Sequence, residues 1–193
     1  MKNRKAALAI LRLAAAISFA LPAAAQDTGF YGGLSLGQSQ AKDTCDDVAA
    51  GVSCDDKDTA WRVLGGYQFN RHFALEVGYT DLGEVSARAG AVNIGVESSA
   101  LELVGVASWP LAQGFSAYGK VGLYRGETDL SSNVGVSANE SNDDLTFGFG
   151  LRYDLNKSVG VRAEWQRYGD VGGGDIGGES DVDVISLGVI FKF

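Results

Sequence analysis

Strict alternation of apolar with small or polar residues recurs eight times along this chain and constrains its fold more than any other feature. A period of two residues is typical of β-strands, because successive side chains point to opposite faces of a sheet. The strands predicted from it cover residues 30–37, 61–69, 73–80, 101–109, 115–124, 145–153, 159–166 and 185–193. The sequence therefore predicts an all-β protein.

The connections between these strands alternate in length. Short ones lie near residues 70–71, 110–114 and 154–157, and long ones run roughly over 40–58, 81–98, 126–144 and 169–183. An even number of strands with short turns at one end and long loops at the other is typical of outer-membrane proteins. The predicted fold is an eight-stranded antiparallel up-and-down transmembrane β-barrel with short periplasmic turns and long extracellular loops. A soluble up-and-down barrel such as a lipocalin is the alternative.

The aromatic residues distinguish these two folds. Of the 18 aromatic residues after residue 26, 14 fall on the apolar face of the predicted strands. The other four are tyrosines (Tyr31, Tyr118, Tyr124 and Tyr168), whose hydroxyls can form hydrogen bonds inside a polar lumen. Glycine, serine and charged residues share that second face, which would make a poor soluble core. An apolar exterior rich in aromatic residues fits a lipid-facing barrel.

The first 25 residues have the form of a secretory signal peptide. Three basic residues precede an apolar stretch that ends before Pro22, and Ala23-Ala24-Ala25 supplies a cleavage site of the A-x-A type. Arg12 interrupts the apolar stretch, which is too short for a transmembrane helix. We therefore expect a cleaved signal peptide over residues 1–25 and one outer-membrane barrel domain over residues 26–193.

Composition and charge exclude several functions. A single histidine and two cysteines are too few for a histidine triad, a His-rich metal centre or a four-cysteine zinc site, so no metal and no cofactor is expected. Removing residues 1–25, which hold four basic residues and no acidic one, changes the net charge from −8 to −12 and argues against nucleic-acid binding. His72 falls in a short turn on the periplasmic side, away from outer-leaflet substrates. We expect no enzymatic activity.

Several short motifs are spread over residues 27–193, and their order and spacing are informative. They are Phe30-Tyr31-Gly32-Gly33, Leu36-Gly37, Gly65-Gly66-Tyr67-Gln68, Glu76-Val77-Gly78-Tyr79, Arg162-Ala163-Glu164-Trp165-Gln166 and Ser186-Leu187-Gly188-Val189. In these motifs the chain resembles the transmembrane barrel of the outer membrane protein A family. The resemblance implies an outer-membrane location among lipid and lipopolysaccharide, after export through the periplasm.

The last residue adds to this resemblance. Phe193 is similar to the C-terminal signal that such barrels present to the barrel assembly machinery. Larger members of the family continue into a periplasmic peptidoglycan-binding domain, whereas this sequence stops at Phe193. It therefore resembles a barrel-only member, close in form to the small adhesin-type barrels.

Charged residues on the inward face of the strands are the candidate functional residues of the lumen. They are Arg62, Glu76, Glu102, Lys120, Arg152, Arg162 and Glu164, with Lys192 near the periplasmic rim. Opposite charges at one level are expected to pair, because unpaired charge in a narrow lumen is costly. An eight-stranded barrel is just wide enough for side chains to fill. Two interpretations remain open, a packed polar core that locks the barrel and a narrow gated pore.

The resemblance to the family implies a gate. An inward Glu–Arg pair acts as the gate there, and its positions match Glu76 and Arg162 in this chain. A second family pairing, between a lysine and a glutamate, corresponds to Val106 and Arg152. A gate in this chain would therefore use Lys120, Arg152 and Glu164 instead.

The predicted long loops are strongly acidic, with 19 acidic and three basic residues among them. Such loops suit divalent cations or basic ligands at the cell surface, with Asp46-Asp47 and Asp55-Asp56 as one candidate patch. The alternative is a solvated surface that resists aggregation. Cys45 and Cys54 lie in the first loop, and in an oxidising compartment we predict a disulfide between them.

These features together predict a monomeric outer-membrane barrel. Its expected role is structural, in envelope integrity, or in surface interaction through the acidic extracellular loops. The alternative is a narrow, gated, porin-like channel for ions or small solutes.

Overall fold

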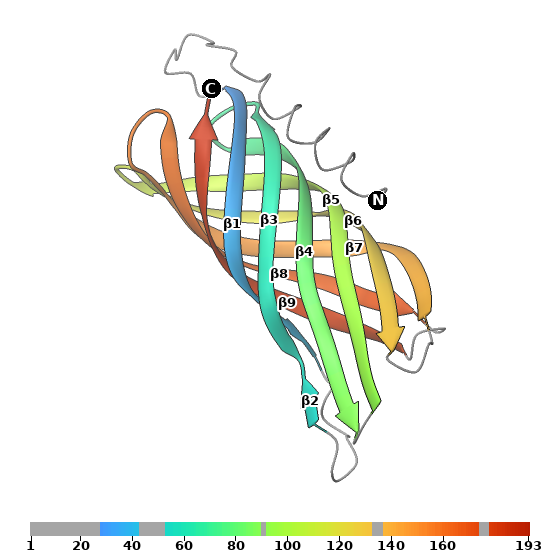
Figure 1. Ribbon diagram of the computed structural model, residues 1–193. Coiled ribbons are helices and arrows are strands. Elements are labelled where there is room, and N and C mark those ends of the chain that lie inside the picture. Colours follow the sequence, from blue (N-terminus) through green and yellow to red (C-terminus); the bar gives the residue numbers. More distant parts are fainter. Residues whose placement is uncertain (1–27, 43–52, 90–91, 133–136, 174–177) are drawn as a thin grey trace, which may run out of the picture.

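The computed structural model describes residues 28–42, 53–89, 92–132, 137–173 and 178–193. Within these ranges the chain forms a sheet of nine strands (Figure 1). They are β1 (Gly29–Ala41), β2 (Ser53–Asp55), β3 (Lys57–Gln68), β4 (Phe73–Ala89), β5 (Val92–Ala112), β6 (Phe115–Ser132), β7 (Ser137–Asp154), β8 (Val159–Gly173) and β9 (Gly178–Lys192). The short β2 pairs with the far end of β4. The other eight strands form the barrel.

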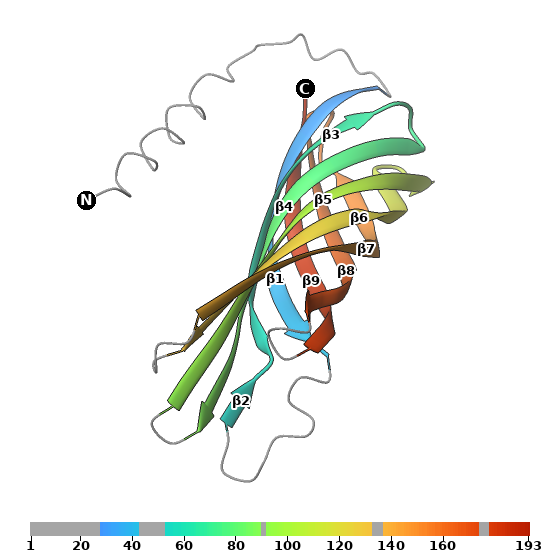
Figure 2. The same cartoon turned by 90° about the vertical axis from the view of Figure 1, so that its right-hand side faces the viewer.

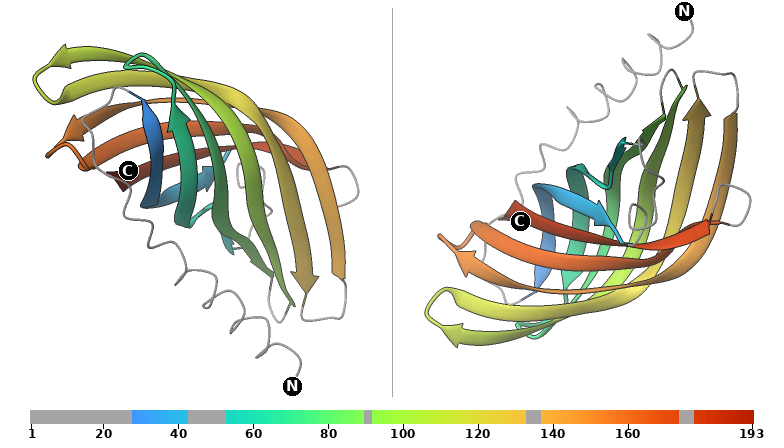
Figure 3. Two further views of the ribbon diagram at one scale, coloured as in Figure 1. Left: turned by 90° about the horizontal axis from the view of Figure 1, so that it is seen from above. Right: turned by 90° about the horizontal axis from the view of Figure 1, so that it is seen from below.

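These eight strands close into an antiparallel up-and-down β-barrel (Figure 3). Each strand pairs with its neighbours in the chain, and β1 closes the ring by pairing with β9, for example Leu34 with Val189. Three short turns, over residues 69–72, 113–114 and 155–158, lie at one end, which we call the turn end. Closure pairs the edge strands with each other, so that their backbone N–H and C=O groups form hydrogen bonds within the barrel, as a lipid environment requires.

The strands are longer at the other end than the sequence predicted. Residues 81–98, 126–144 and 169–183 were expected to be loops, but most of their described residues continue β4–β5, β6–β7 and β8–β9 as paired hairpins. We call these three hairpins the arms, and Figure 2 shows those of β4–β5 and β6–β7 projecting from the barrel. When the outer face of a strand lies in water, its residues need not alternate between apolar and polar. The alternation pattern therefore could not reveal these strand extensions. Register shifts at Asp81/Gly83 and Tyr168/Val171 lie where the arms begin.

The barrel has an apolar outer face. Thirteen of the 14 aromatic residues expected there are exposed, and Trp165 is half-buried. The four inward tyrosines are at most 6% exposed, which confirms their assignment to the interior. The bulky apolar residues thus point outward, as in a barrel surrounded by lipid and unlike a lipocalin-type core. Among the described residues, no helix has the length and apolar character needed to cross a membrane.

Candidate functional site

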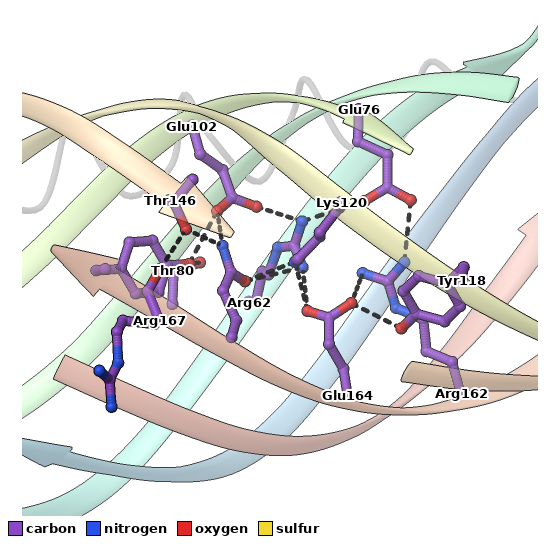
Figure 4. Close-up of polar contacts among 12 residues, drawn as sticks. Arg62, Glu76, Thr80, Glu102, Tyr118, Lys120, Thr146, Arg162, Glu164 and Arg167 are labelled. Carbon is purple, nitrogen blue, oxygen red and sulfur yellow. Dashed lines mark hydrogen bonds and ion pairs between the residues drawn. The ribbon is translucent and has the colours of Figure 1, made fainter. Parts of the chain in front are cut away.

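Six charged side chains from five strands meet in the middle of the lumen (Figure 4). They are Arg62 on β3, Glu76 on β4, Glu102 on β5, Lys120 on β6, and Arg162 and Glu164 on β8. We call this set the charge network. Each member is at most 6% exposed, and positive and negative charges are equal in number. Alternation places them here, because every one lies on the inward face of its strand.

Arg62 is the centre of the charge network. Its Nη1 donates to Oε1 of Glu164 at 2.8 Å, and its Nη2 lies 3.2 Å from Oε2 of Glu76. The same Nη2 also forms an ion pair with Glu102. One guanidinium thus holds three carboxylates that come from three different strands, a task suited to its planar fork of donors.

Lys120 completes the arm-side part of the charge network. Its Nζ donates to Oε1 of Glu164 at 2.5 Å and to Oε1 of Gln166 at 2.6 Å. The amide nitrogen of Gln166 in turn donates to Oε2 of Glu102, at 2.6 Å, and to the hydroxyl of Thr146, at 2.8 Å. The amide therefore links the lysine to a carboxylate that the lysine does not contact directly.

Arg162 forms the turn-side part of the charge network. Its Nη1 donates to Oε1 of Glu76 at 3.0 Å, and its Nη2 lies 3.5 Å from Oε2 of Glu164. Tyr31 donates to the same Glu76 oxygen at 2.8 Å, and Tyr118 donates to Oε2 of Glu164 at 2.7 Å. The tyrosines that the sequence placed inward therefore cap the buried carboxylates.

An apolar cluster lies above the charge network, on the side of the arms. Its members are Ala41, Ala60, Leu82, Ala100, Tyr124, Tyr168, Val171, Val182 and Val184, and we call it the apolar plug. Tyr168 joins the two layers, since its hydroxyl donates to Oε2 of Glu102 at 2.9 Å. Sequence reasoning missed this plug because several members lie in segments predicted as acidic loops. The signal that remained was inward alternation of Val182 and Val184.

Arg152 lies apart from the charge network. Its Nε donates to Oδ1 of Asp154 at 2.9 Å, and Lys192 binds Oδ2 of the same carboxylate at 2.8 Å. Its direct cross-strand neighbour is Arg162. Among the described contacts, Arg152 meets neither Lys120 nor Glu164, so the structure does not assemble the three residues that the sequence proposed for an alternative gate. Val106 lines a cavity at the turn end of the lumen.

The outward face of the arms is polar and carries two ion pairs, an exposed one between Arg125 and Asp143 and a half-buried one between Arg167 and Asp183. Arg125 binds Asp143 at 2.7 Å, and Arg167 binds Asp183 at 2.6 Å. These hydrogen bonds lower the pKa of both aspartates below the ordinary value of 3.8. The arms thus begin where the apolar outer face ends.

An acidic concavity is lined by residues of β3, β4, β5 and β6. It has a volume of about 490 Å³, and its lining includes Asp58, Asp81, Glu84, Glu97, Glu127 and Asp129 together with Trp61 and Tyr79. Within the described residues, no group of three or more His, Cys, Asp or Glu side chains is placed to hold a metal ion. The concavity therefore offers a broad negative surface next to two aromatic rings.

Other predicted features fall outside the described residues. Residues 1–25 and Cys45 lie there, as do Asp46 and Asp47 of the candidate acidic patch. Cys54 belongs to β2. The signal peptide and the disulfide stay predictions.

Comparison with known proteins gives consistent relatives. A family model described as "OmpA-like transmembrane domain" matches residues 25–193. Outer membrane protein A of Salmonella typhi is 28% identical over 200 residues, covering 98% of this chain and 55% of the relative. The protein of Escherichia coli O157:H7 is 27% identical over 191 residues, with coverage of 98% and 55%. The chain thus spans about half the length of these curated relatives.

Solved structures support the same fold. Neisserial surface protein A aligns with a TM-score of 0.63 at 16% identity, covering 86% of this chain and 97% of that one. The outer membrane protein OprG of Pseudomonas aeruginosa aligns with a TM-score of 0.54 at 16% identity, with coverage of 88% and 98%. The attachment invasion locus protein Ail of Yersinia pestis, crystallised with the heparin analogue sucrose octasulfate, gives 0.52 at 16%, with coverage of 86% and 99%.

Proposed function

Since the chain belongs to the family of OmpA-like transmembrane domains and is an outer-membrane β-barrel, we propose that its lumen is a closed structural core and that its arms present an acidic surface to partners outside the cell. The general role of such barrels lies in the envelope or at its surface. In the finer proposal, the lumen stabilises the barrel and the arms bind partners.

The filling of the lumen is the observation that carries the proposal. A solute that entered from the arm end would first meet the apolar plug and then the charge network. The charge network is neutral in sum, and its ion pairs link β3, β4, β6 and β8 across the lumen. A path through it would require breaking several buried ion pairs at once. Such a core supports a role in holding the barrel together.

The acidic concavity supports the second half of the proposal. Six carboxylates beside Trp61 and Tyr79 favour a basic ligand, since cations are attracted both by the negative potential and by aromatic faces. The Ail protein was crystallised with a heparin analogue, which is a polyanion. The arms of this chain are acidic and carry the same sign of charge as that polyanion. We therefore propose a cationic partner instead, such as a basic peptide or a polyamine.

Other parts of the proposal follow from the sequence. We propose that residues 1–25 are removed on export, that Cys45 and Cys54 form a disulfide, and that Phe193 is recognised by the barrel assembly machinery. The barrel is proposed to act as a monomer in lipid and lipopolysaccharide. Its family and fold are those of non-enzymatic outer-membrane barrels, and we propose no catalytic role.

A gated channel is the second candidate function, and one observation favours it. Arg62 and Lys120 each contact more than one acceptor, so a side chain can exchange one partner for another without leaving the lumen. Glu76 would be the residue to release, because it holds Arg162 on one side and Arg62 on the other. Opening would also require displacement of the apolar plug.

Ion conductance of the refolded mature chain, residues 26–193, in planar bilayers separates the two functions. A structural core predicts a silent wild type and a Glu76→Ala variant that unfolds more readily, because Arg62 and Arg162 then lose a buried partner. Discrete current steps in the wild type that Glu76→Ala enlarges would establish the channel instead. Circular dichroism on the same samples shows that each is folded.

Binding of oligolysine to the same protein in lipid nanodiscs tests the surface role. We expect binding that weakens with salt and that falls in the Glu97→Gln/Asp129→Gln variant. Asp143→Asn is the matched control, since that carboxylate lies outside the lining of the concavity. Equal binding by all three proteins would contradict the proposal.

A further inference from the structure

Two arginines face each other inside the lumen at the turn end. Arg152 on β7 and Arg162 on β8 are direct cross-strand partners, and both lie on the inward face. Like charges in this arrangement repel, because the Cβ atoms of directly opposed residues are only about 5 Å apart. Arg162 has its carboxylates in the charge network, and Arg152 has Asp154. On their other sides, Arg152 lies opposite Ser116 of β6 and Arg162 lies opposite Gly188 of β9, so neither arginine has an acid directly across from it.

Both guanidinium groups keep buried N–H groups without an acceptor. These are Nη2 of Arg152 and both Nε and Nη2 of Arg162, and none has a hydrogen-bond partner among the described residues. The 3.5 Å approach of Arg162 Nη2 to Glu164 is an ion pair too long for a strong hydrogen bond. Arg162 is only 6% exposed, so water outside the barrel does not satisfy it. A buried charged donor without an acceptor is costly.

The two arginines line one small cavity. It has a volume of about 20 Å³ and is also lined by Glu76, Tyr31 and Tyr118. The oxygens of Glu76 already accept from Arg62, Arg162 and Tyr31, and Tyr118 donates to Glu164. The space suffices for about one guest of the size of a water molecule.

The charges around this cavity do not balance. The charge network is neutral, whereas Arg152 and Lys192 share the single carboxylate of Asp154. The inward-facing side chains at the turn end therefore carry one positive charge in excess. A monovalent anion would neutralise that charge and accept the remaining N–H groups.

We propose that this cavity is a binding site for one monatomic anion, chloride in the natural setting, held between Arg152 and Arg162. The anion would accept hydrogen bonds from the unpartnered N–H groups of Arg152 and Arg162. It would also screen the two guanidinium groups from each other. The small volume of the cavity, about 20 Å³, favours a monatomic anion over sulfate or phosphate. The site is independent of whether the lumen is a closed core or a gated channel.

Thermal unfolding of the refolded mature chain in detergent micelles tests the site. Sodium chloride is compared with sodium gluconate at equal ionic strength, because gluconate is too large for the cavity. At about ten times the dissociation constant, chloride should raise the Tm of the wild type by roughly 2–4 °C. Arg152→Gln should abolish this difference, and Arg125→Gln, which changes an exposed pair on the arms, should retain it.

A second variant keeps the test valid if Arg152→Gln fails to fold. Arg152→Glu places a carboxylate opposite Arg162 and supplies the missing acceptor covalently. We expect it to fold, to match or exceed the wild-type Tm, and to be insensitive to chloride. A wild type with equal Tm in both salts, or an Arg152→Glu protein that still responds to chloride, would overturn the proposal.

Crystals grown in sodium bromide locate the anion directly, through the anomalous scattering of bromine. The expected peak lies between Arg152 and Arg162 in the wild type and is missing in Arg152→Glu. A wild-type cavity without a bromide peak, or with one that persists in Arg152→Glu, would show that the space holds only water or that the two arginines do not define the site.

Discussion

Arg62 and Glu164 join two strands that are not neighbours in the sheet. Arg62 lies on β3 and Glu164 on β8, and β1 and β9 separate them around the ring. Their side chains nevertheless meet at 2.8 Å, across the lumen. The ion pair therefore connects opposite sectors of the wall, a connection that the backbone hydrogen bonds between adjacent strands cannot provide.

Removal of the central guanidinium should weaken the barrel strongly. In Arg62→Met, three buried carboxylates lose a partner and the charge network becomes negative. Breaking one side of a buried ion pair costs about 3–5 kcal/mol. Urea unfolding in lipid vesicles, followed by tryptophan fluorescence, measures the loss. Arg125→Met is the control, because its pair with Asp143 is exposed and should contribute little. Similar losses in both variants would refute a bracing role for Arg62.

The hydroxyl of Tyr168 should contribute more to the stability of the barrel than that of Tyr124, although the two rings pack against each other at 5.2 Å. The hydroxyl of Tyr168 donates to the carboxylate of Glu102, whereas that of Tyr124 donates to a backbone carbonyl. Loss of a hydrogen bond to a charged group costs about 1.5–3 kcal/mol, against about 0.5–1.5 for a neutral one. The Tyr→Phe variants at both positions, compared by the same unfolding assay, should differ in this order.

Two glycines of the barrel should respond oppositely to a methyl group. A Cβ at Gly122 would overlap the carbonyl oxygen of Leu103 and the backbone of Val104, whereas a Cβ at Gly65 would meet nothing within 4 Å. Gly122→Ala should therefore destabilise the barrel by about 1–3 kcal/mol through overpacking. Gly65→Ala should leave it unchanged or slightly stabilised. Refolding yield and unfolding midpoint measure both, and equal yields would contradict the close approach at Gly122.

The pair between Arg167 and Asp183 predicts a pH dependence of the β8–β9 arm. The hydrogen bond from Arg167 lowers the pKa of Asp183 below 3.8 in the folded state. The stabilisation is therefore complete above pH 3.8 and is lost as the pH falls through the lower, folded pKa. Carbon-13 NMR titration of the Asp183 carboxyl should show this pKa. Arg167→Gln should return it toward the ordinary value, and Arg125→Gln should leave it depressed.

Alternation was sufficient to predict the barrel and the membership of its polar interior. Arg62, Glu76, Glu102, Lys120, Arg162 and Glu164 could all be placed inward, because a period of two assigns a face without knowledge of the fold. Alternation alone could not predict their partners, since pairing depends on depth and register. The contact between Glu76 and Arg162 was implied only by the family resemblance. Arg152 illustrates this, because only the register of β7 against β8 sets it opposite Arg162.

The arms and the apolar plug escaped prediction for a related reason. Acidic residues in segments such as 169–183 are typical of loops, so these segments were predicted as loops. The alternation of Val182 and Val184, which is typical of a strand, was too short to change that prediction. Backbone pairing continues through these segments regardless of side-chain polarity, because water solvates the outer face of the hairpin. Composition therefore marked the end of the lipid-facing surface correctly but placed the end of the strands too early.

The length of the arms has a consequence for recognition at the cell surface. Residues 125–132 of β6 extend roughly 25 Å along the strand, from the rate of rise of a β-strand. Because these residues are paired with β7, their carboxylates stand at fixed heights and spacings above the lipid, on a relatively stiff two-stranded support. A partner would meet a preformed pattern of charge, and association would lose less conformational entropy than binding to an unstructured acidic loop.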